Sequence, residues 1–234
     1  MTQNSYGQFC PVAMAAEIVC NRWTVIVLRE LVAGSTRFNE IRRGVPRMSP
    51  ALLSKRLKEL EEAGVVARIA SPTEPGVLEY HLTRAGRELQ PVVEALGFWG
   101  QRWVDSNASL GRLDPDLLMW DMRRNIDLTP MPQRRSVIAF IFPEQSAKRR
   151  NFWLVVAPGS DVDLCSIDPG FDVDLYVSTD LRTMTAIWMG LTSLRAEVAA
   201  GRVLLTGDRK LGADMETWLR LSPFAAESRK AAIA

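Results

Sequence analysis

From Ser49 to Gly64 the chain reads SPALLSKRLKELEEAG, which is the pattern of a capped amphipathic helix. Ser49 can accept a backbone N–H as the N-cap, and Pro50 suits the first helical position because the N–H that it lacks would have no partner there. Gly64 can adopt the left-handed conformation that ends a helix. Three leucines recur at helical spacing and share the face that a core would bury: Leu53, Leu57 and Leu60.

The opposite face of this predicted helix carries small, hydroxyl and cationic side chains. Ala51 and Ser54 would let the backbone approach a DNA groove closely, while Lys55 and Lys58 can reach phosphates or guanine edges. A solvated surface helix would show the same pattern, so the neighbouring elements have to decide between the two interpretations.

Positive charge is concentrated around this helix, although the formal net charge of the chain is only +2. Residues 37–58 hold seven Lys and Arg against the single acid Glu40. Such a local field is a candidate footprint on nucleic-acid phosphates. The candidate DNA-contacting residues are Arg37, Arg43, Arg47, Ser49, Ala51, Ser54, Lys55, Arg56, Lys58 and Arg68.

A winged helix-turn-helix is expected around this stretch. Helices are predicted at residues 11–20, 23–31 and 37–43, and a short turn separates the last of them from the Ser49 helix. Two strands, at residues 65–70 and 77–82, would form the wing behind it. Glu74 at the wing tip is unfavourable for a contact with the DNA backbone, so Arg68 is a better candidate for DNA contact than the residues of the tip.

A long helix is expected from Arg84 to about Ser106, bent or restarted at Pro91. Its apolar stripe is wide and aromatic: Leu89, Val92, Val93, Leu96, Trp99 and Trp103. A single winged helix has little core left for such a stripe, which favours a partner helix from a second copy of the chain. Packing against the chain's own second half is the alternative.

Taken together, the motifs of this half resemble the HxlR type of bacterial winged helix-turn-helix regulators. The motifs are Cys10-Pro11, Trp23, Arg37-Phe38-Asn39-Glu40-Ile41, Ser49-Pro50-x-Leu52-Leu53-Ser54-x-Arg56-Leu57-x-x-Leu60, Tyr80-x-Leu82-Thr83-x-x-Gly86 and Trp99-Gly100. The resemblance covers roughly residues 9–105. It implies a homodimer that reads two half-sites of a pseudo-palindromic operator in double-stranded DNA, with residues 49–60 as the recognition helix.

Cys10 matches the N-terminal cysteine of that family, which in some members senses oxidants or electrophiles. It precedes a predicted helix, whose positive dipole end favours a thiolate. A buried or inert thiol is the alternative. With Cys20 and Cys165 the chain has three cysteines, an odd number that does not indicate a disulfide framework.

The second half of the chain has a different composition. Residues 106–111 are linker-like and divide the chain into predicted domains at 1–106 and 112–225. A helix near residues 116–125 opens the second domain, and strands and helices follow it. The strands are expected at residues 136–142, 151–157, 162–167, 172–177 and 202–206, with helices at 181–189, at 192–201 and at the end, near 221. Turn residues between the first four strands favour an antiparallel meander with helices on one face.

This half holds more apolar bulk than so small a domain needs, which suggests a ligand cavity. The candidate lining residues are Trp120, Phe152, Trp153, Phe171, Trp188, Met189, Leu191 and Trp218. A filled aromatic core is the alternative. The strand with Asp172-x-Asp174-Leu175 before a capped helix, the segment GRVLLTGD from Gly201 to Asp208 and a final helix with Trp218 resemble sterol-carrier-protein-like lipid-binding domains. That resemblance implies an apolar tunnel for lipids or acyl chains.

An enzyme is not expected, because the sequence contains no phosphate-cradling glycine loop, no Gly-x-Ser-x-Gly and no His-Glu-x-x-His. Neither a cofactor nor a metal is expected, since His81 is the single histidine and no Cys/His cluster accompanies it. No signal peptide or membrane span is recognisable, so we expect a cytoplasmic protein without a membrane partner.

The sequence therefore predicts an α+β protein with two domains, a winged helix-turn-helix and a sterol-carrier-like antiparallel sheet. We expect a homodimeric, sequence-specific transcriptional regulator, with repression favoured over activation, whose second domain senses a small hydrophobic or acyl-type ligand. Two alternatives stay open at this point. One is redox or electrophile sensing through Cys10, and the other is a lipid-binding carrier with a vestigial DNA-binding half.

Overall fold

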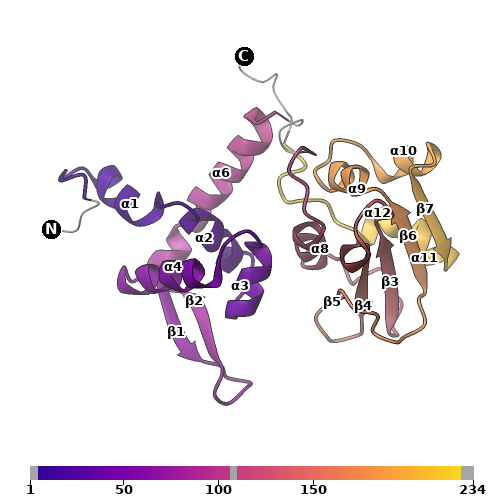
Figure 1. Cartoon of the computed structure of the whole chain (residues 1–234), viewed down its shortest axis with the longest axis horizontal. Coiled ribbons are helices and arrows are strands. Elements are labelled where there is room, and N and C mark those ends of the chain that lie inside the picture. The colour runs from indigo at the N-terminus through magenta and orange to yellow at the C-terminus, as the bar shows by residue number, and fades with distance from the viewer. Residues whose placement is uncertain (1–4, 106–109, 228–234) are drawn as a thin grey trace. The chain divides into compact units, whose positions relative to one another are not determined.

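The computed structural model describes residues 5–105 and 110–227 of the chain (Figure 1). By its contacts the chain divides into two units, Met1–Gly97 and Phe98–Ala234, and the division falls inside helix α6 (Gln90–Trp103). The last turns of α6 belong to the second unit, where Gln101 Nε2 donates a hydrogen bond to Met189 O at 3.0 Å. Residues 106–109 of the predicted linker lie outside the described residues, and the predicted domain limits stay a prediction.

The first unit contains the predicted order of helices and strands. Its elements are α1 (Pro11–Val19), α2 (Thr24–Val32), α3 (Phe38–Gly44), α4 (Pro50–Glu62), β1 (Val66–Ala70), β2 (Leu78–Leu82), α5 (Arg84–Glu88) and the first turns of α6. The helix expected from Arg84 is interrupted at Leu89, two residues before Pro91. β1 and β2 pair antiparallel, from Val66 opposite Leu82 to Ala70 opposite Leu78, and form the wing.

Helix α4 has the ends that its sequence predicts. Ser49 Oγ accepts a hydrogen bond from Leu52 N at 3.3 Å, Pro50 is the first helical residue, and Gly64 has a φ of +70° just past the end. The three leucines Leu53, Leu57 and Leu60 are buried in the core of this unit beside Val27 and Ile41. This apolar face anchors α4 against α2 and leaves the opposite face exposed.

The second unit is a mixed sheet with helices. Its elements are α8 (Pro115–Arg123), β3 (Ser136–Ile141), the 3-10 turn η1 (Ala147–Arg149), β4 (Asn151–Val156), β5 (Asp163–Cys165), β6 (Leu175–Thr179), α9 (Leu181–Trp188), α10 (Leu194–Ala199), β7 (Val203–Gly207), α11 (Arg209–Ala213) and α12 (Met215–Trp218). The strand order is β5-β4-β3-β6-β7.

The prediction of an all-antiparallel sheet is wrong at one pair, because β3 and β6 run parallel. Asp174, just before β6, explains this direction. Asp174 N donates to Val137 O at 2.9 Å, and Val137 N donates to Asp174 Oδ2 at 2.8 Å. These bonds hold the beginnings of both strands at the same edge of the sheet, so the chain has to cross the sheet between β5 and β6.

A single core fills the space between the sheet and the helices of the second unit. Alternate side chains of β4 and β6, such as Leu154 and Val177, point into it and meet Met184 and Trp218 from the helices. On the other face, Tyr176 and Leu204 are exposed. In the described part of the chain no single helix is long and apolar enough to cross a membrane; α1 and α2 reach that length and composition only together, with a bend of 82° between them.

Candidate nucleic-acid interface

The exposed face of α4 carries the side chains that the sequence assigned to DNA contact. Ala51, Ser54, Lys55 and Lys58 are exposed on this helix, opposite the buried leucines. The Lys55 ammonium lies 3.9 Å from Glu59, and the Lys58 ammonium lies 3.6 Å from Glu62. Such pairs on a helix surface contribute little to stability, so both lysines can exchange their partners for phosphates.

Arg56, another candidate for DNA contact, does not lie on this exposed face. Its side chain is only 15% exposed, and its guanidinium forms an ion pair with Glu59. Arg56 Nε also donates to the carbonyl oxygen of Arg22 at 3.1 Å. The physical reason is the helical period: position 56 comes three residues after the buried Leu53 and four before the buried Leu60, so it borders the core face.

Arg37 is also engaged within the chain. Its guanidinium donates to Glu74 at 2.8 Å and lies 3.7 Å from Glu79, so it links the start of α3 to the wing. The hydrogen bond to Glu74 raises the pKa of Arg37. Hydrogen bonds from Ser71 and then from His81 lower the pKa of Glu79, which keeps that carboxylate charged. Sequence inspection placed Glu74 at the wing tip but did not indicate this partner.

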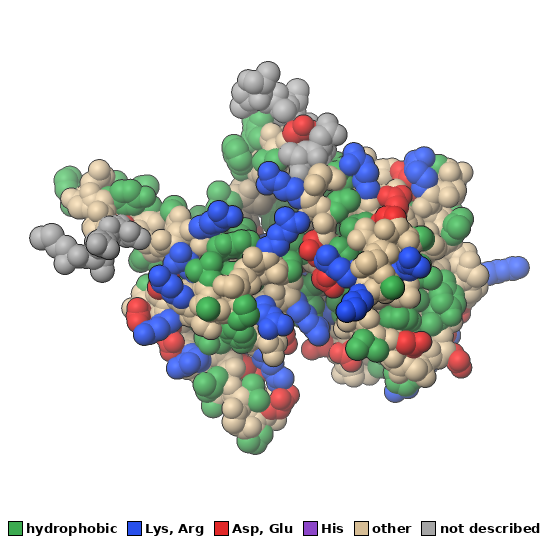
Figure 2. All heavy atoms as spheres, in the orientation of Figure 1, with side chains coloured by type: hydrophobic (Ala, Val, Ile, Leu, Met, Phe, Trp, Pro, Cys, Tyr) green, Lys and Arg blue, Asp and Glu red, His purple; other side chains and the backbone are tan. Residues whose placement is uncertain are grey.

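The remaining predicted cations lie at the surface of the first unit. Arg43, Arg47 and Ser49 are exposed in and after α3, and Arg68 on β1 is exposed 3.9 Å from Glu61. Figure 2 shows Lys and Arg side chains over the visible face of this unit, with fewer acidic side chains between them. This distribution is suited to a polyanionic partner.

Cys10 occupies the N-cap of α1 and is half-exposed. The backbone N–H of Ala13, and after it that of Val12, lowers the pKa of the Cys10 thiol. These are the free N–H groups of the first helical turn, which stabilise a negative sulfur atom. The geometry therefore favours the thiolate form at this position.

Four of the eight side chains proposed to line a ligand cavity in the second unit lie in its packed interior. Trp120, Phe152, Trp188 and Trp218 are between 0% and 7% exposed. Trp218 Nε1 donates to Leu211 O at 2.8 Å, so even its polar atom has a partner there. This arrangement corresponds to the filled aromatic core that was the alternative interpretation.

The other four predicted lining residues are spread over the unit. Trp153 and Met189 are half-buried. Phe171 is 41% exposed, and the guanidinium of Arg135 lies 4.3 Å from its ring centre. Leu191 lines a cavity of about 510 Å³ together with Ile187 and Gly190.

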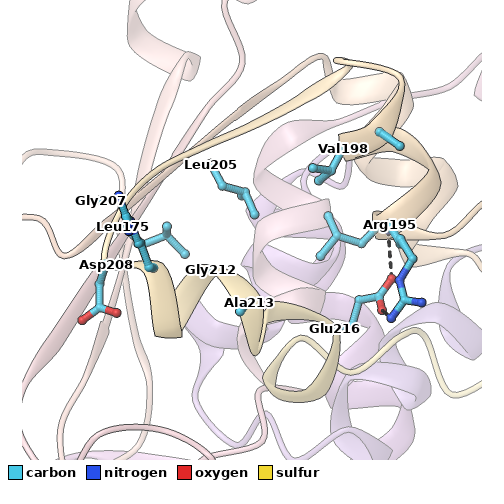
Figure 3. Close-up of a pocket in the computed structure, with 12 residues that line it drawn as sticks. Leu175, Arg195, Val198, Leu205, Gly207, Asp208, Gly212, Ala213 and Glu216 are labelled. Atoms are coloured by element: carbon cyan, nitrogen blue, oxygen red, sulfur yellow. Dashed lines mark hydrogen bonds and ion pairs between the residues drawn. The ribbon is translucent and has the colours of Figure 1, made fainter.

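A second cavity of about 510 Å³ lies between α10, β7 and α11 (Figure 3). Leucine, valine and small residues line most of it, together with the charged residues Arg195, Asp208, Arg209 and Glu216. The sequence reasoning did not select any of these positions. The available signal was the small residues Gly207, Gly212 and Ala213, which leave space beside the last strand. Within the described residues, no group of three or more His, Cys, Asp or Glu could hold a metal ion.

Comparison with known proteins identifies the first unit. A family model described as HxlR-like helix-turn-helix matches residues 18–108. The uncharacterized HTH-type transcriptional regulator YvaP of Bacillus subtilis (strain 168) is 39% identical over 100 residues, which cover 42% of this chain and 93% of YvaP. YtfH of Escherichia coli (strain K12), another uncharacterized HTH-type transcriptional regulator, is 35% identical over 96 residues, which cover 41% of this chain and 76% of YtfH.

Among solved structures, the reduced form of the transcriptional regulator YodB from B. subtilis is 32% identical, with a TM-score of 0.37. That alignment covers 42% of this chain and 97% of the YodB chain. The sequence relatives align over most of their own length, and the family model spans the helix-turn-helix and the wing. The chain therefore belongs to the HxlR-like helix-turn-helix family.

Proposed function

We propose that this protein is a homodimeric transcriptional regulator in which α4 reads the operator and the second unit senses a small ligand. Family membership makes the chain a DNA-binding transcriptional regulator. The observation that carries the assignment of the reading element is the division of α4 into a buried leucine face and an exposed face with Ala51, Ser54, Lys55 and Lys58.

The reading face is matched to a major groove. A helix fits that groove, and small side chains such as Ala51 and Ser54 let the α4 backbone come close to base edges. Lys55 and Lys58 extend further along the helix and would contact phosphates or guanine edges. The wing would follow the backbone beside it, with Arg68 on β1 as its cation. Arg37 would act indirectly, by holding the wing through Glu74.

Dimerisation is proposed from exposed apolar side chains on α6. Val92, Leu96 and Trp99 are 50%, 50% and 59% exposed and recur at helical spacing. A stripe of this kind is costly in water and is typical of a helix that packs against a partner. A second copy is the partner that also explains a two-fold operator, because two-fold symmetry places two recognition helices on two half-sites.

Ligand sensing is proposed for the second unit, whose resemblance to sterol-carrier-protein-like domains implies an apolar ligand. A ligand changes DNA affinity only if it binds the DNA-competent state and the other state with different affinity. Repression relieved by the ligand is the favoured outcome.

Thiol sensing is the second candidate, and it rests on the lowered pKa of Cys10 at the start of α1. It predicts that Cys10→Ser abolishes any response of DNA binding to an oxidant while basal DNA affinity survives. An oxidant response that persists in Cys10→Ser would remove this candidate.

Fluorescence anisotropy of the full-length protein tests the DNA-binding function. The protein is titrated with duplex DNA from immediately upstream of its own coding region and with a scrambled duplex, at two salt concentrations. We expect tighter binding to the upstream duplex, with a preference that survives the higher salt, because base contacts are less salt-dependent than phosphate contacts. Equal and weak binding to both duplexes would contradict the proposal and favour a lipid carrier with a vestigial DNA-binding half.

A further inference from the structure

We propose that Glu79 is a positioning residue for DNA binding, which holds the wing at the distance from α4 that contact with the same duplex requires. The inference rests on the proposed function, in which α4 reads the operator and the wing follows the backbone beside it. It deepens that function, because it names a buried partner through which Arg37 holds the wing in place.

Glu79 is an acidic residue in a buried position. It is 8% exposed on β2, whereas the side chain of Glu74 at the wing tip is 53% exposed. Burial of a carboxylate is costly unless hydrogen-bond donors or cations surround it. A charged residue at this position therefore needs partners, and the wing and α3 supply them.

Side chains from the wing and from α3 meet at this carboxylate. Ser71 Oγ, just after β1, donates to Glu79 Oε1 at 2.7 Å, and His81 Nε2 on β2 lies 3.0 Å from Oε2. Arg37 Nε, at the N-cap of α3, lies 3.7 Å from Oε1. The same guanidinium donates to Glu74 at 2.8 Å. The Glu79 carboxylate thus joins the two strands of the wing to each other and to α3.

The base of the wing has a separate support from the backbone. Tyr80 N donates to Thr36 O at 2.7 Å, and β1 and β2 form an antiparallel ladder. These bonds do not involve the Glu79 side chain, so we expect the hairpin to stay folded when that side chain changes. The turn of the wing extends away from the helices of the unit (Figure 1), and its tip is joined to α3 through Arg37. The carboxylate therefore sets the orientation of the wing, and not whether the wing forms.

The candidate DNA contact of the wing lies next to Glu79 in this hairpin. Glu79 pairs with Ile69, and Arg68 is the neighbouring residue on β1. Arg68 is exposed, and its Nε lies 3.9 Å from Glu61, which is a loose surface pair. A guanidinium reaches a phosphate only if its strand lies at the right distance from the groove that α4 occupies. Because α3 and α4 share one core, fixing Glu79 to α3 also fixes Arg68 relative to α4.

Charge alone predicts the opposite effect of a substitution at Glu79. Removal of a carboxylate from a surface that faces phosphates reduces repulsion and should strengthen DNA binding. A loss of affinity when this charge is removed therefore has to come from position. Glu79→Gln tests this, because the amide has the shape of the carboxylate but does not attract Arg37 as a charge.

Fluorescence anisotropy of the full-length protein with the upstream duplex, at several salt concentrations, measures the effect. Arg68→Ala should weaken binding roughly fivefold and reduce the salt slope by about one, because one phosphate contact is lost. We expect Glu79→Gln to give the same two changes, and the double variant Glu79→Gln/Arg68→Ala to lose no more than either single variant. Lys58→Ala, on α4, should instead add its full loss to that of Glu79→Gln, as independent sites do.

Two further variants separate position from charge and from stability. Glu88→Gln on α5 removes an exposed carboxylate outside the wing and should behave as the wild type. Arg37→Lys keeps the positive charge but lacks the planar group that reaches Glu74 and Glu79 together, so it should weaken binding as Glu79→Gln does. Circular dichroism and urea denaturation check that each variant is folded. If Glu79→Gln does not fold, the test uses Arg37→Lys and Ser71→Ala, which removes the hydrogen bond at 2.7 Å.

Operator affinity that rises or stays the same in Glu79→Gln overturns the inference. So does a double variant in which the losses of Glu79→Gln and Arg68→Ala are fully additive. If Lys58→Ala weakens binding and Glu79→Gln does not, the role of α4 stands and the inference fails. If Glu79→Gln and Arg68→Ala act as one unit while Lys58→Ala has no effect, the positioning role stands and the proposed reading face of α4 is wrong.

Discussion

Glu30 and Gly44 form a contact between α2 and α3 that leaves no room for a larger residue. The Glu30 side chain is fully buried and accepts hydrogen bonds from Arg29 Nη2 at 2.7 Å and from Ser35 Oγ at 3.3 Å. Arg29 Nη2 also donates to Gly44 O at 2.7 Å. A Cβ atom at Gly44 would lie 1.8 Å from Glu30 Cδ, so the buried carboxylate would have to move.

We therefore expect Gly44→Ala to lower the free energy of unfolding by about 2 kcal/mol, as overpacking typically does. Urea denaturation followed by circular dichroism measures this loss. Gly100→Ala in α6 is the control, because nothing lies within 4 Å of its Cβ position, and it should be neutral or slightly stabilising. An equal loss in both variants would mean that the contact with Glu30 is not the cause.

The lowered pKa of Asp127 makes the stability of the fold depend on pH. Hydrogen bonds from Thr129, followed by the one from Arg220, lower the pKa of Asp127 from 3.8 to about 2. Thr129 N lies 2.9 Å from Oδ1, and Arg220 Nε lies 3.1 Å from Oδ2. Because the pKa in the folded state is depressed, this carboxylate stabilises the fold above its ordinary pKa. The stabilisation is lost as pH falls through the folded value.

We expect Asp127→Asn to lower the melting temperature of the protein at neutral pH. The difference from the wild type should stay constant down to roughly pH 5 and disappear as pH approaches about 2. Thermal melts followed by circular dichroism at a series of pH values give the result. A difference that does not change across this interval would contradict the assigned role of the Thr129 and Arg220 hydrogen bonds.

At the scale of the element, α4 has an exposed face, which we propose for DNA contact, and a face that the core buries. Lys58→Ala should weaken operator binding and reduce the salt slope by about one, because a phosphate contact is lost, with no change in stability. Arg56→Ala should instead lower stability by roughly 1 kcal/mol, since its partners Glu59 and Arg22 O lose a donor. Anisotropy at several salt concentrations and urea denaturation measure the two effects. If Arg56→Ala weakened operator binding and Lys58→Ala left it unchanged, α4 would present another face to DNA.

At the scale of the whole molecule, the exposed stripe of α6 predicts the oligomeric state. Leu96→Glu should convert the dimer to a monomer, because a charge replaces a side chain that the partner copy would bury. The protomer should stay folded, since Leu96 is 50% exposed within it. Sedimentation velocity measures the mass. Gln90→Ala is the control on the same helix, because it changes an exposed polar side chain outside the apolar stripe, and it should leave the dimer intact. A wild-type protein that sediments as a monomer would contradict the dimer itself.

The parts of the fold that sequence inspection predicted are those with local causes. The Ser49 cap, Pro50 and Gly64 act within one or two turns of α4, and the leucine period needs only the helix itself. The wing was predictable from two short segments of strand-forming residues on either side of a turn. For the same reason the break before Pro91 was foreseeable, as a proline acts on its own helix.

The features that sequence inspection did not reveal depend on distant parts of the chain. Arg56 and Arg37 look like free cations in the sequence, but their partners Arg22 and Glu74 lie 34 and 37 residues away. In the sequence, Trp120 and Trp218 look like the lining of a ligand cavity. Only the folded second unit shows that they are buried in its packed interior. Asp174 accepts a hydrogen bond from Val137 N, 37 residues earlier in the chain, and so aligns the start of β6 with the start of β3. No periodicity or composition reports such pairings.

The sequence by itself determined the helix-turn-helix, the two faces of α4 and the family, because caps, turns and apolar periods act over short distances along the chain. Only the tertiary structure decided which cations stay at the surface, how the second sheet is ordered, and where a cavity remains open. Those features depend on long-range packing, in which a side chain finds its partner only after the backbone has folded. The cavity at Gly212 shows this difference clearly, because its walls come from β6, β7, α10 and α11.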